Sequence, residues 1–195
     1  MTVPAAARVV DAVGAGLGPA VLAGTAIRRP VPIPGVGEGI AWLVRDDDAD
    51  HPMQCYVGVW PDGAVRLLSD DQPAFFDLVA ATGADIVDPS TALGYVRAFL
   101  EVTRGPAVIV REVRDVADLR WRPGSQSEEA NRARFEAGPP IEPPVVEPSA
   151  GGFHVELTLV VDQRVQRNVF DVGRDGSIRT GYRVLADDLP LPIAR

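Results

Sequence analysis

The sequence predicts an α+β fold in which a largely antiparallel sheet wraps around a buried helix. Residues 153–186 alternate apolar and polar side chains, which is the period of half-buried antiparallel strands. Residues 89–104 repeat apolar side chains at helical spacing and leave only a narrow polar stripe, as expected of a helix buried on most sides. Asp-Gly pairs at 62–63 and 175–176 are typical of hairpin turns.

Residues 1–37 are predicted to form an irregular, Gly/Pro-rich segment with one short helix at residues 4–13. The glycines and the proline between residues 14 and 19 are expected to break any continuous helix. Because Asp11 also interrupts this apolar stretch, it is not predicted to be a membrane or signal segment. Residues 38–195 are predicted to form a single α+β domain.

The middle of the chain shows two helices with clear boundary signals. Asp70 or Asp71 is expected to begin the first helix and Gly83 to end it, while Asp88 begins the second. A polar helix is expected to start at Ser125 or Ser127, and the Pro-rich residues 138–150 are predicted to be a linker or long loop. The remaining predicted strands lie at residues 39–45, 53–60, 64–69, 107–113 and 118–121.

The last three strands are predicted at residues 153–161, 164–174 and 177–186, with Asp162–Arg164 as a three-residue loop. In that register, one face is apolar. Its predicted members are Phe153, Val155, Leu157, Leu159, Val161, Val165, Val169, Ile178, Tyr182 and Val184. The predicted members of the polar face are His154, Glu156, Thr158, Gln166, Asn168, Arg179 and Arg183, with Phe170 among them. Thr158, Asn168 and Arg183 are expected to lie side by side.

The order of these elements, a helix followed by a curved antiparallel meander, resembles cystatin-like and NTF2-like architectures over residues 88–186. The resemblance is one of element order and rests on no sequence motif. Folds of this kind carry many functions, so the resemblance implies an architecture and no particular activity.

The chain contains no lysine, so all 19 of its basic side chains are arginines. Chemistry that needs a lysine Schiff base, a Walker A loop or the protein-kinase lysine is therefore excluded. The single cysteine, Cys55, cannot form an internal disulfide, and we expect a cytoplasmic protein. Codon-usage bias toward Arg, Ala, Gly and Pro indicates a bacterial, GC-rich genome. No cofactor is predicted.

Negative charge is concentrated in residues 41–88, where ten Asp and two Arg give −8, as much as the net charge of the whole chain. This sign disfavours nucleic acid and favours a basic protein partner. The candidate binding residues are Asp46, Asp47, Asp48 and Asp50. They match the start of a calcium loop, but His51 and Val57 stand where glycine and glutamate are required, so no metal site is predicted.

A second candidate site lies on the polar face of the C-terminal sheet. His154 and Glu156 share one face of a strand and form a candidate acid–base pair. Arg179 and Arg183, with Asn168 nearby, form a candidate anion site because guanidinium groups bind carboxylates and phosphates.

These patterns lead to three functional hypotheses. The first is a non-catalytic binding or accessory protein, such as an immunity protein, an inhibitor or an assembly subunit, that acts through a protein partner. The alternative is a cofactor-independent enzyme or carrier of the cyclase, dehydratase or isomerase type, with a pocket between helix and sheet. The third is a homo-oligomer formed through the edge strand at residues 177–186. No nucleic-acid or membrane partner is predicted.

Overall fold

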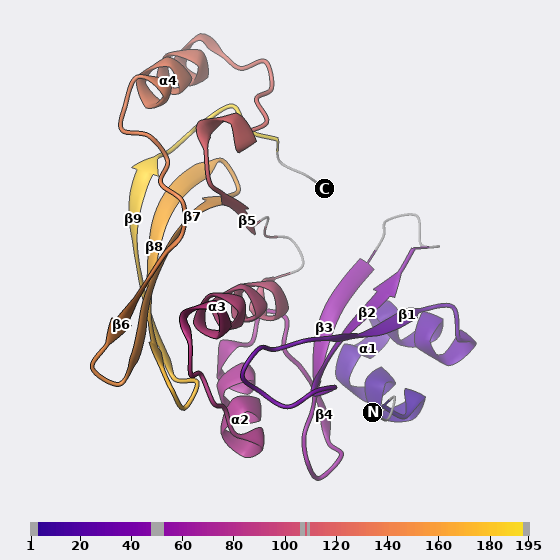
Figure 1. Cartoon of the computed structure of the whole chain (residues 1–195). Coiled ribbons are helices and arrows are strands. Elements are labelled where there is room, and N and C mark those ends of the chain that lie inside the picture. The colour runs from indigo at the N-terminus through magenta and orange to yellow at the C-terminus, as the bar shows by residue number, and fades with distance from the viewer. Residues whose placement is uncertain (1–3, 48–52, 106–107, 109, 193–195) are drawn as a thin grey trace. The chain divides into compact units, whose positions relative to one another are not determined.

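The computed structural model describes residues 4–47, 53–105, 108 and 110–192 (Figure 1). It has an α+β fold with two antiparallel sheets, which confirms the predicted class at that level. The chain forms two compact units. Unit 1 comprises residues 1–106 and 173–177, and unit 2 comprises residues 107–172 and 178–195. The division at residue 37/38 that the sequence suggested is not the boundary between these units, and it stays a prediction.

Unit 1 combines three helices with one antiparallel sheet of strand order β1-β2-β3-β4. Its elements are α1 (Ala6–Ala23), β1 (Ile27–Val31), β2 (Ala41–Asp46), β3 (Met53–Val59), β4 (Val65–Leu67), α2 (Gln72–Thr82) and α3 (Pro89–Thr103). The first four residues of β2 are all buried, so this strand is covered on both faces. Its Trp42 packs in a cluster with residues of α1 and β3.

Unit 2 contains the second sheet, in which β5-β7-β8-β9 follow one another and β6 also pairs with β7. Its elements are β5 (Val110–Val113), a 3₁₀ turn (Val116–Asp118), α4 (Gln126–Glu136), β6 (Val145–Ser149), β7 (Gly152–Val161), β8 (Arg164–Gly173) and β9 (Ile178–Ala186). Because β8 occupies one edge of β7, the short strands β5 and β6 follow each other along its other edge.

The first helix is longer than the sequence predicted. A kink at Gly14, with φ 65° and ψ −156°, marks the expected break, but helix resumes and continues to Ala23. Leu17 and Val21 are buried in the same cluster as Trp42, so packing against the sheet outweighs the weak helix propensity of the glycines. Among the described residues, α1 is the one helix long and apolar enough to cross a membrane by length and composition.

The helices α2 and α3 begin at the residues that the sequence indicated. The carboxylate of Asp71 accepts a hydrogen bond from the Ala74 N–H, and that of Asp88 accepts from the Ser90 and Thr91 N–H groups. Within unit 1, α3 contacts α2 and β3. The wrapping of this helix by the C-terminal sheet stays a prediction.

Two predictions for unit 2 are wrong. Residues 119–121 form no strand, because a capping box between Asp115 and Asp118 closes a 3₁₀ turn just before them. The Pro-rich residues 138–150 were expected to hold no regular element, yet their second half forms β6. Pro148 is tolerated there because β6 is an edge strand, where a proline need not donate to a ladder.

The register of the C-terminal strands differs from the prediction by one residue. The loop between β7 and β8 contains Asp162 and Gln163 only, and a β-bulge follows at Val165/Gln166. Asn168 therefore pairs with Tyr182, and Arg167 takes the predicted place of Asn168 opposite Arg183. A loop one residue shorter moves the side chains of β8 by one position, which sequence alternation alone does not reveal.

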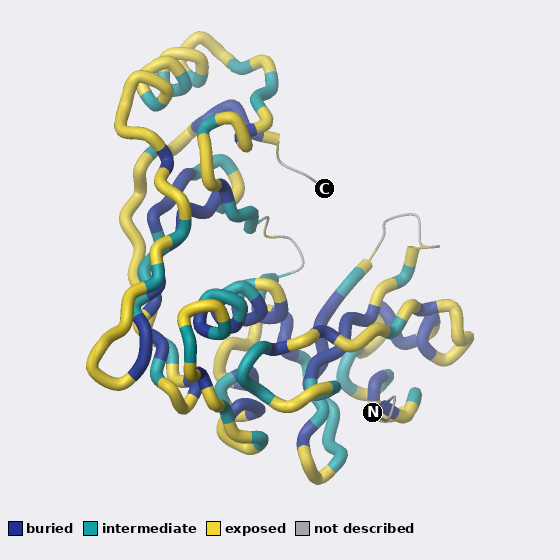
Figure 2. Tube along the Cα trace, in the orientation of Figure 1, coloured by how far each residue is buried: buried dark blue, intermediate teal, exposed yellow. Residues whose placement is uncertain are grey.

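The edge strand β9 is exposed along most of its length, as Figure 2 shows in yellow. Tyr182 and Val184, predicted on the apolar face, are 64% and 42% exposed. The apolar residues Phe153, Val155, Leu157 and Leu159 of β7 are buried as expected.

Candidate functional site

Unit 2 contains a cavity of about 600 Å³ over the polar face of the sheet. Its wall combines β7, β8, β9, the second half of α4 and the Pro-rich segment that follows. The lining residues are Asn131, Arg134, Phe135, Gly138, Pro139, Pro140, Glu142, Glu156, Thr158, Arg167, Arg183, Val184, Leu185, Ala186 and Asp187. This cavity lies beside α4, whereas the sequence placed a pocket between the helix of residues 89–104 and the polar face, and that pocket stays a prediction.

The floor of the cavity is held by the buried guanidinium group of Arg167. Its Nε donates to Glu156 Oε2 at 3.0 Å, and its Nη1 donates to the Glu142 carbonyl at 3.1 Å and to Thr158 Oγ1 at 3.3 Å. The Arg167 side chain is 8% exposed, and Thr158 is fully buried. Buried charges require such paired and hydrogen-bonded surroundings, so Arg167 serves mainly to fix this wall.

The ion pairs continue from Glu156 to His154 at the rim. His154 Nε2 lies 3.2 Å from Glu156 Oε1, and Nδ1 lies 2.8 Å from Asp171 Oδ1. The hydrogen bonds to Asp171 and Glu156 raise the pKa of His154 above its ordinary value. The pKa of Glu156 is lowered, chiefly by its hydrogen bond from Arg167. Both groups therefore favour their charged forms, and both ring nitrogens of His154 are already occupied by protein carboxylates.

Each carboxylate of the cavity wall lies near an arginine, and Glu142 and Glu156 share one. Glu156 pairs with Arg167, whose Nη2 also lies 3.8 Å from the carboxylate of Glu142. Asp187 accepts a hydrogen bond from Arg164 Nη2 at 3.0 Å. The carboxylates of the lining are therefore already in ion pairs within the protein.

Two lining arginines, in contrast, remain without an anionic partner. Within the described part of the chain, the side chains of Arg134 and Arg183 make no hydrogen bond and no ion pair. Arg134 comes from α4 and Arg183 from β9, so the two guanidinium groups enter the wall from different elements. The charged residues of the lining are three arginines and three carboxylates, so its formal charge is zero, but the exposed guanidinium groups of Arg134 and Arg183 have no partner among the described residues and suit an anionic ligand.

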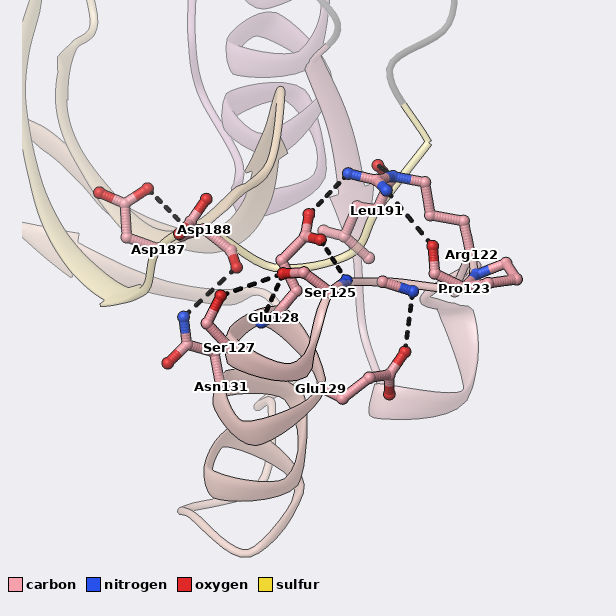
Figure 3. A network of polar contacts seen from close by, with 11 residues as sticks. Arg122, Pro123, Ser125, Ser127, Glu128, Glu129, Asn131, Asp187, Asp188 and Leu191 are labelled. Carbon is pink, nitrogen blue, oxygen red and sulfur yellow. Dashed lines mark hydrogen bonds and ion pairs between the residues drawn. The ribbon is translucent and has the colours of Figure 1, made fainter.

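A polar network holds the N-terminal end of α4 in place (Figure 3). Ser125 and Glu128 form a reciprocal capping box, and Arg122 Nη2 donates to Glu128 Oε1 at 2.7 Å. Arg122 also binds the C-terminal tail, because its N–H donates to the Pro190 carbonyl and its Nε to the Leu191 carbonyl. The network fixes the helix that supplies three residues of the cavity wall.

The apolar part of the wall comes from Phe135 and two adjacent prolines, Pro139 and Pro140. Phe135 also makes an edge contact with Trp121 and packs on the cluster that contains Ile141. This packing anchors the end of α4, and Phe135 adds apolar surface to the lining of the cavity. Arrangements of this kind, apolar walls with a few placed polar groups, are typical of ligand sites.

The predicted residues of the polar face separate into two groups. Glu156 and Arg183 line the cavity, and His154 binds Glu156 but is not part of the lining. Arg179 and Asn168 lie outside the lining; Arg179 is exposed, and Asn168 Nδ2 donates to the Gln166 carbonyl. The predicted pairing of Arg179 with Arg183 as one clamp is thus not formed at this cavity.

The acidic candidates belong to unit 1. Asp46 ends β2, Asp47 pairs with Arg45, and Asp48 and Asp50 lie outside the described residues. No group of three or more potential metal ligands is found in the described ranges. Burial raises the pKa of the Cys55 thiol to about 11, which keeps it protonated and poorly nucleophilic at neutral pH.

Two residues of the site were missed by sequence reasoning. Arg167 stands between Gln166 and Asn168 in β8, a polar run that does not fit simple alternation and was the available signal of an uncertain register. Arg134 lies on a helix whose sequence is polar on all sides, with no buried residue. Nothing in the sequence of that helix distinguished Arg134, which lines the cavity, from Arg132, which does not.

Comparison of the chain with protein-family models, curated proteins and solved structures finds no match. The function of the site must therefore be inferred from its own chemistry. The lining contains Arg167, which pairs with Glu142 and Glu156, and it contains apolar residues. It also contains two arginines, Arg134 and Arg183, that have no anionic partner among the described residues.

Proposed function

We propose that this protein is a non-catalytic binding protein that holds a carboxylate-bearing ligand in the cavity of unit 2. The observation that carries this proposal is the pair of arginines, Arg134 and Arg183, that line a cavity whose own carboxylates already pair with other arginines. A ligand carboxylate would accept hydrogen bonds from these guanidinium groups, and its apolar part would pack on Phe135 and the prolines.

The position of the arginines favours a carboxylate over a phosphate. Arg134 and Phe135 belong to the last turn of α4, where helix carbonyl groups carry partial negative charge. A phosphate dianion is disfavoured there, and no glycine-rich loop or helix N-terminus is part of the lining. A singly charged carboxylate with an apolar body fits this mixture of charge and apolar surface better.

The ion-pair chain supports binding over acid–base chemistry. Glu156 pairs with Arg167, and each ring nitrogen of His154 lies within hydrogen-bonding distance of a carboxylate. Proton transfer by His154 would require breaking one of these bonds. The alternative of a cyclase-, dehydratase- or isomerase-type enzyme with His154 and Glu156 stays a proposal, tested when a ligand and its product are compared.

A titration with a simple probe tests the proposed function. We expect the ¹⁹F signal of 4-(trifluoromethyl)benzoate to broaden on addition of the protein, with dissociation constants of about millimolar for so small a ligand. Arg183→Gln should remove the effect, while Arg179→Gln should retain it because Arg179 lies on the same strand outside the cavity. If the two variants broaden the probe signal equally, the cavity is not the binding site. If inorganic phosphate binds more strongly than the probe, the preference for a carboxylate is wrong.

The wider hypotheses remain proposals beside this site. One hypothesis is a cytoplasmic accessory protein that binds a basic protein partner through Asp46, Asp47 and Asp48. If it is correct, reversing the charge of these aspartates should slow association with the partner and make the association rate less dependent on salt. Association kinetics that charge reversal leaves unchanged would reject that interface. The cystatin-like or NTF2-like element order of residues 88–186 is likewise proposed; it is supported by the succession of a helix and an antiparallel sheet.

A further inference from the structure

The free edge of β9 is the most open strand surface in the described part of unit 2. All seven residues from Arg179 to Leu185 are exposed, and β9 pairs with β8 alone (Figure 2). In a strand of this kind, backbone N–H and C=O groups along the free edge have no ladder partner. The edge is nine residues long, which is longer than the short edge strands β5 and β6 on the other side of the sheet.

The features that usually prevent strand addition are few here. No proline lies within β9, and the one bulge in its pairing with β8 is at the C-terminal end, near Ala186. Three apolar side chains, Tyr182, Val184 and Leu185, are 64%, 42% and 38% exposed on the strand. Exposed apolar residues on an open edge favour pairing with another extended segment.

The charge of β9 restricts what that segment is. Arg179 and Arg183 are the charged residues of the strand, and it carries no acidic residue. A second copy of β9 would bring four arginines together across one strand pair, which is destabilising. An incoming strand with glutamate or aspartate would instead form cross-strand ion pairs with both arginines.

The edge is continuous with the cavity. Residues 183–187, the end of β9 and the residue that follows, line the cavity, so an extended segment that pairs with β9 passes beside Arg183. A side-chain carboxylate of that segment can then reach Arg183 and Arg134 while its backbone binds the strand. One ligand would therefore use both unpaired features, the arginines and the backbone edge.

We propose that the carboxylate is presented by an extended acidic segment of another protein, which adds to β9 as a further strand. This inference rests on the proposed function and specifies its ligand class. It also accounts for the exposed apolar residues of β9. Side chains of the added strand alternate between the two faces of the sheet, so they would cover apolar residues of β9 on both faces.

The test is fluorescence anisotropy with a labelled ten-residue peptide of alternating glutamate and valine. The matched control is the same peptide with alternate backbone nitrogens methylated on the residues that face β9, which keeps its charges and removes the hydrogen bonds. We expect the unmodified peptide to bind at least about tenfold more tightly than the methylated one. In the protein, the substitution Arg183→Gln should weaken binding of the unmodified peptide. A peptide of alternating lysine and valine should not bind.

Hydrogen exchange followed by NMR gives the second readout. Binding of the peptide should slow exchange at the outward-facing amides among Gly181, Tyr182 and Arg183, whereas trifluoromethylbenzoate should leave them unchanged. Suppose that trifluoromethylbenzoate binds in a manner that depends on Arg183, but the two peptides bind with equal affinity. This result would contradict strand addition at β9 and would still support the proposed carboxylate site. Failure of both probes would overturn both. Slow exchange at these amides in a dimer of the protein alone would assign the edge to a second copy.

Discussion

Unit 1 contains most of the aspartates of the chain and unit 2 contains the cavity, and the two regions use their charged groups in different ways. In unit 1, carboxylates satisfy backbone groups close by in sequence. Asp71 and Asp88 cap helices, and Asp62 accepts from the Ala64 N–H in a turn. In unit 2, Arg167 bridges neighbouring strands, while Arg134 and Arg183 reach a common cavity without a partner.

This difference shows that charge density along a sequence is a weak guide to a binding site. Residues 41–88 are the stretch with the largest net negative charge, yet several of their carboxylates have local structural roles. The sequence of unit 2 has a smaller net charge, but folding places two of its arginines, Arg134 and Arg183, in the lining of a partly apolar cavity. A charge becomes available to a ligand when folding leaves it unpaired in such a place.

The strongest test of this contrast is the substitution Arg167→Met. It should lower the free energy of unfolding by about 2 kcal/mol or more, because it leaves Glu156, Thr158 and the Glu142 carbonyl without their buried donor. Urea unfolding monitored by circular dichroism measures the change. Arg179→Met, on the exposed strand β9, is the matched control and should change stability by less than about 0.5 kcal/mol. Equal effects of the two substitutions would contradict the assigned role of Arg167.

The local role of the unit 1 aspartates is tested by Asp71→Ala. Loss of the hydrogen bond from the Ala74 N–H should cost about 1 kcal/mol of stability, as is usual for a helix N-cap. Asp77→Ala removes the same charge from the exposed side of α2 and should have little effect. If Asp77→Ala destabilises the protein as much as Asp71→Ala, net charge rather than capping explains these aspartates.

A smaller effect is expected from the ion pairs at the rim of the cavity. Since the folded-state pKa of His154 is raised, its pairs with Asp171 and Glu156 stabilise fully below the ordinary histidine pKa of about 6.5. That contribution is lost as the pH rises through the raised value. The lowered pKa of Glu156 keeps its own contribution present above the ordinary carboxyl range, and it is lost as the pH falls through the lowered value.

The measurement is an NMR titration of the His154 ring in a His51→Gln variant, which leaves a single histidine in the chain. A midpoint above the ordinary value is expected, and Asp171→Asn should shift it downward. The destabilisation caused by His154→Gln should be below about 1 kcal/mol because the pairs are partly exposed, and it should shrink at high pH. A midpoint at or below the ordinary value would show that the carboxylates do not hold the imidazolium.

The candidate site was predicted in part. The sequence indicated a polar sheet face with Glu156 and Arg183, because alternation in the strands separates apolar from polar residues. It misplaced Asn168 and missed Arg167, because the loop between β7 and β8 has two residues instead of the predicted three, which moves every side chain of β8 by one position. It also left open which helix covers that face.

Local signals in the sequence determined the antiparallel C-terminal strands, the Asp-Gly turn and the starts of α2, α3 and α4, since capping and turn formation depend on residues that are neighbours in the chain. Tertiary structure decided that α1 continues beyond its kink, that β6 pairs with β7, and that Arg134 and Arg183 share one cavity. These outcomes depend on packing between segments far apart in the sequence, and that packing leaves no periodic trace in either segment alone.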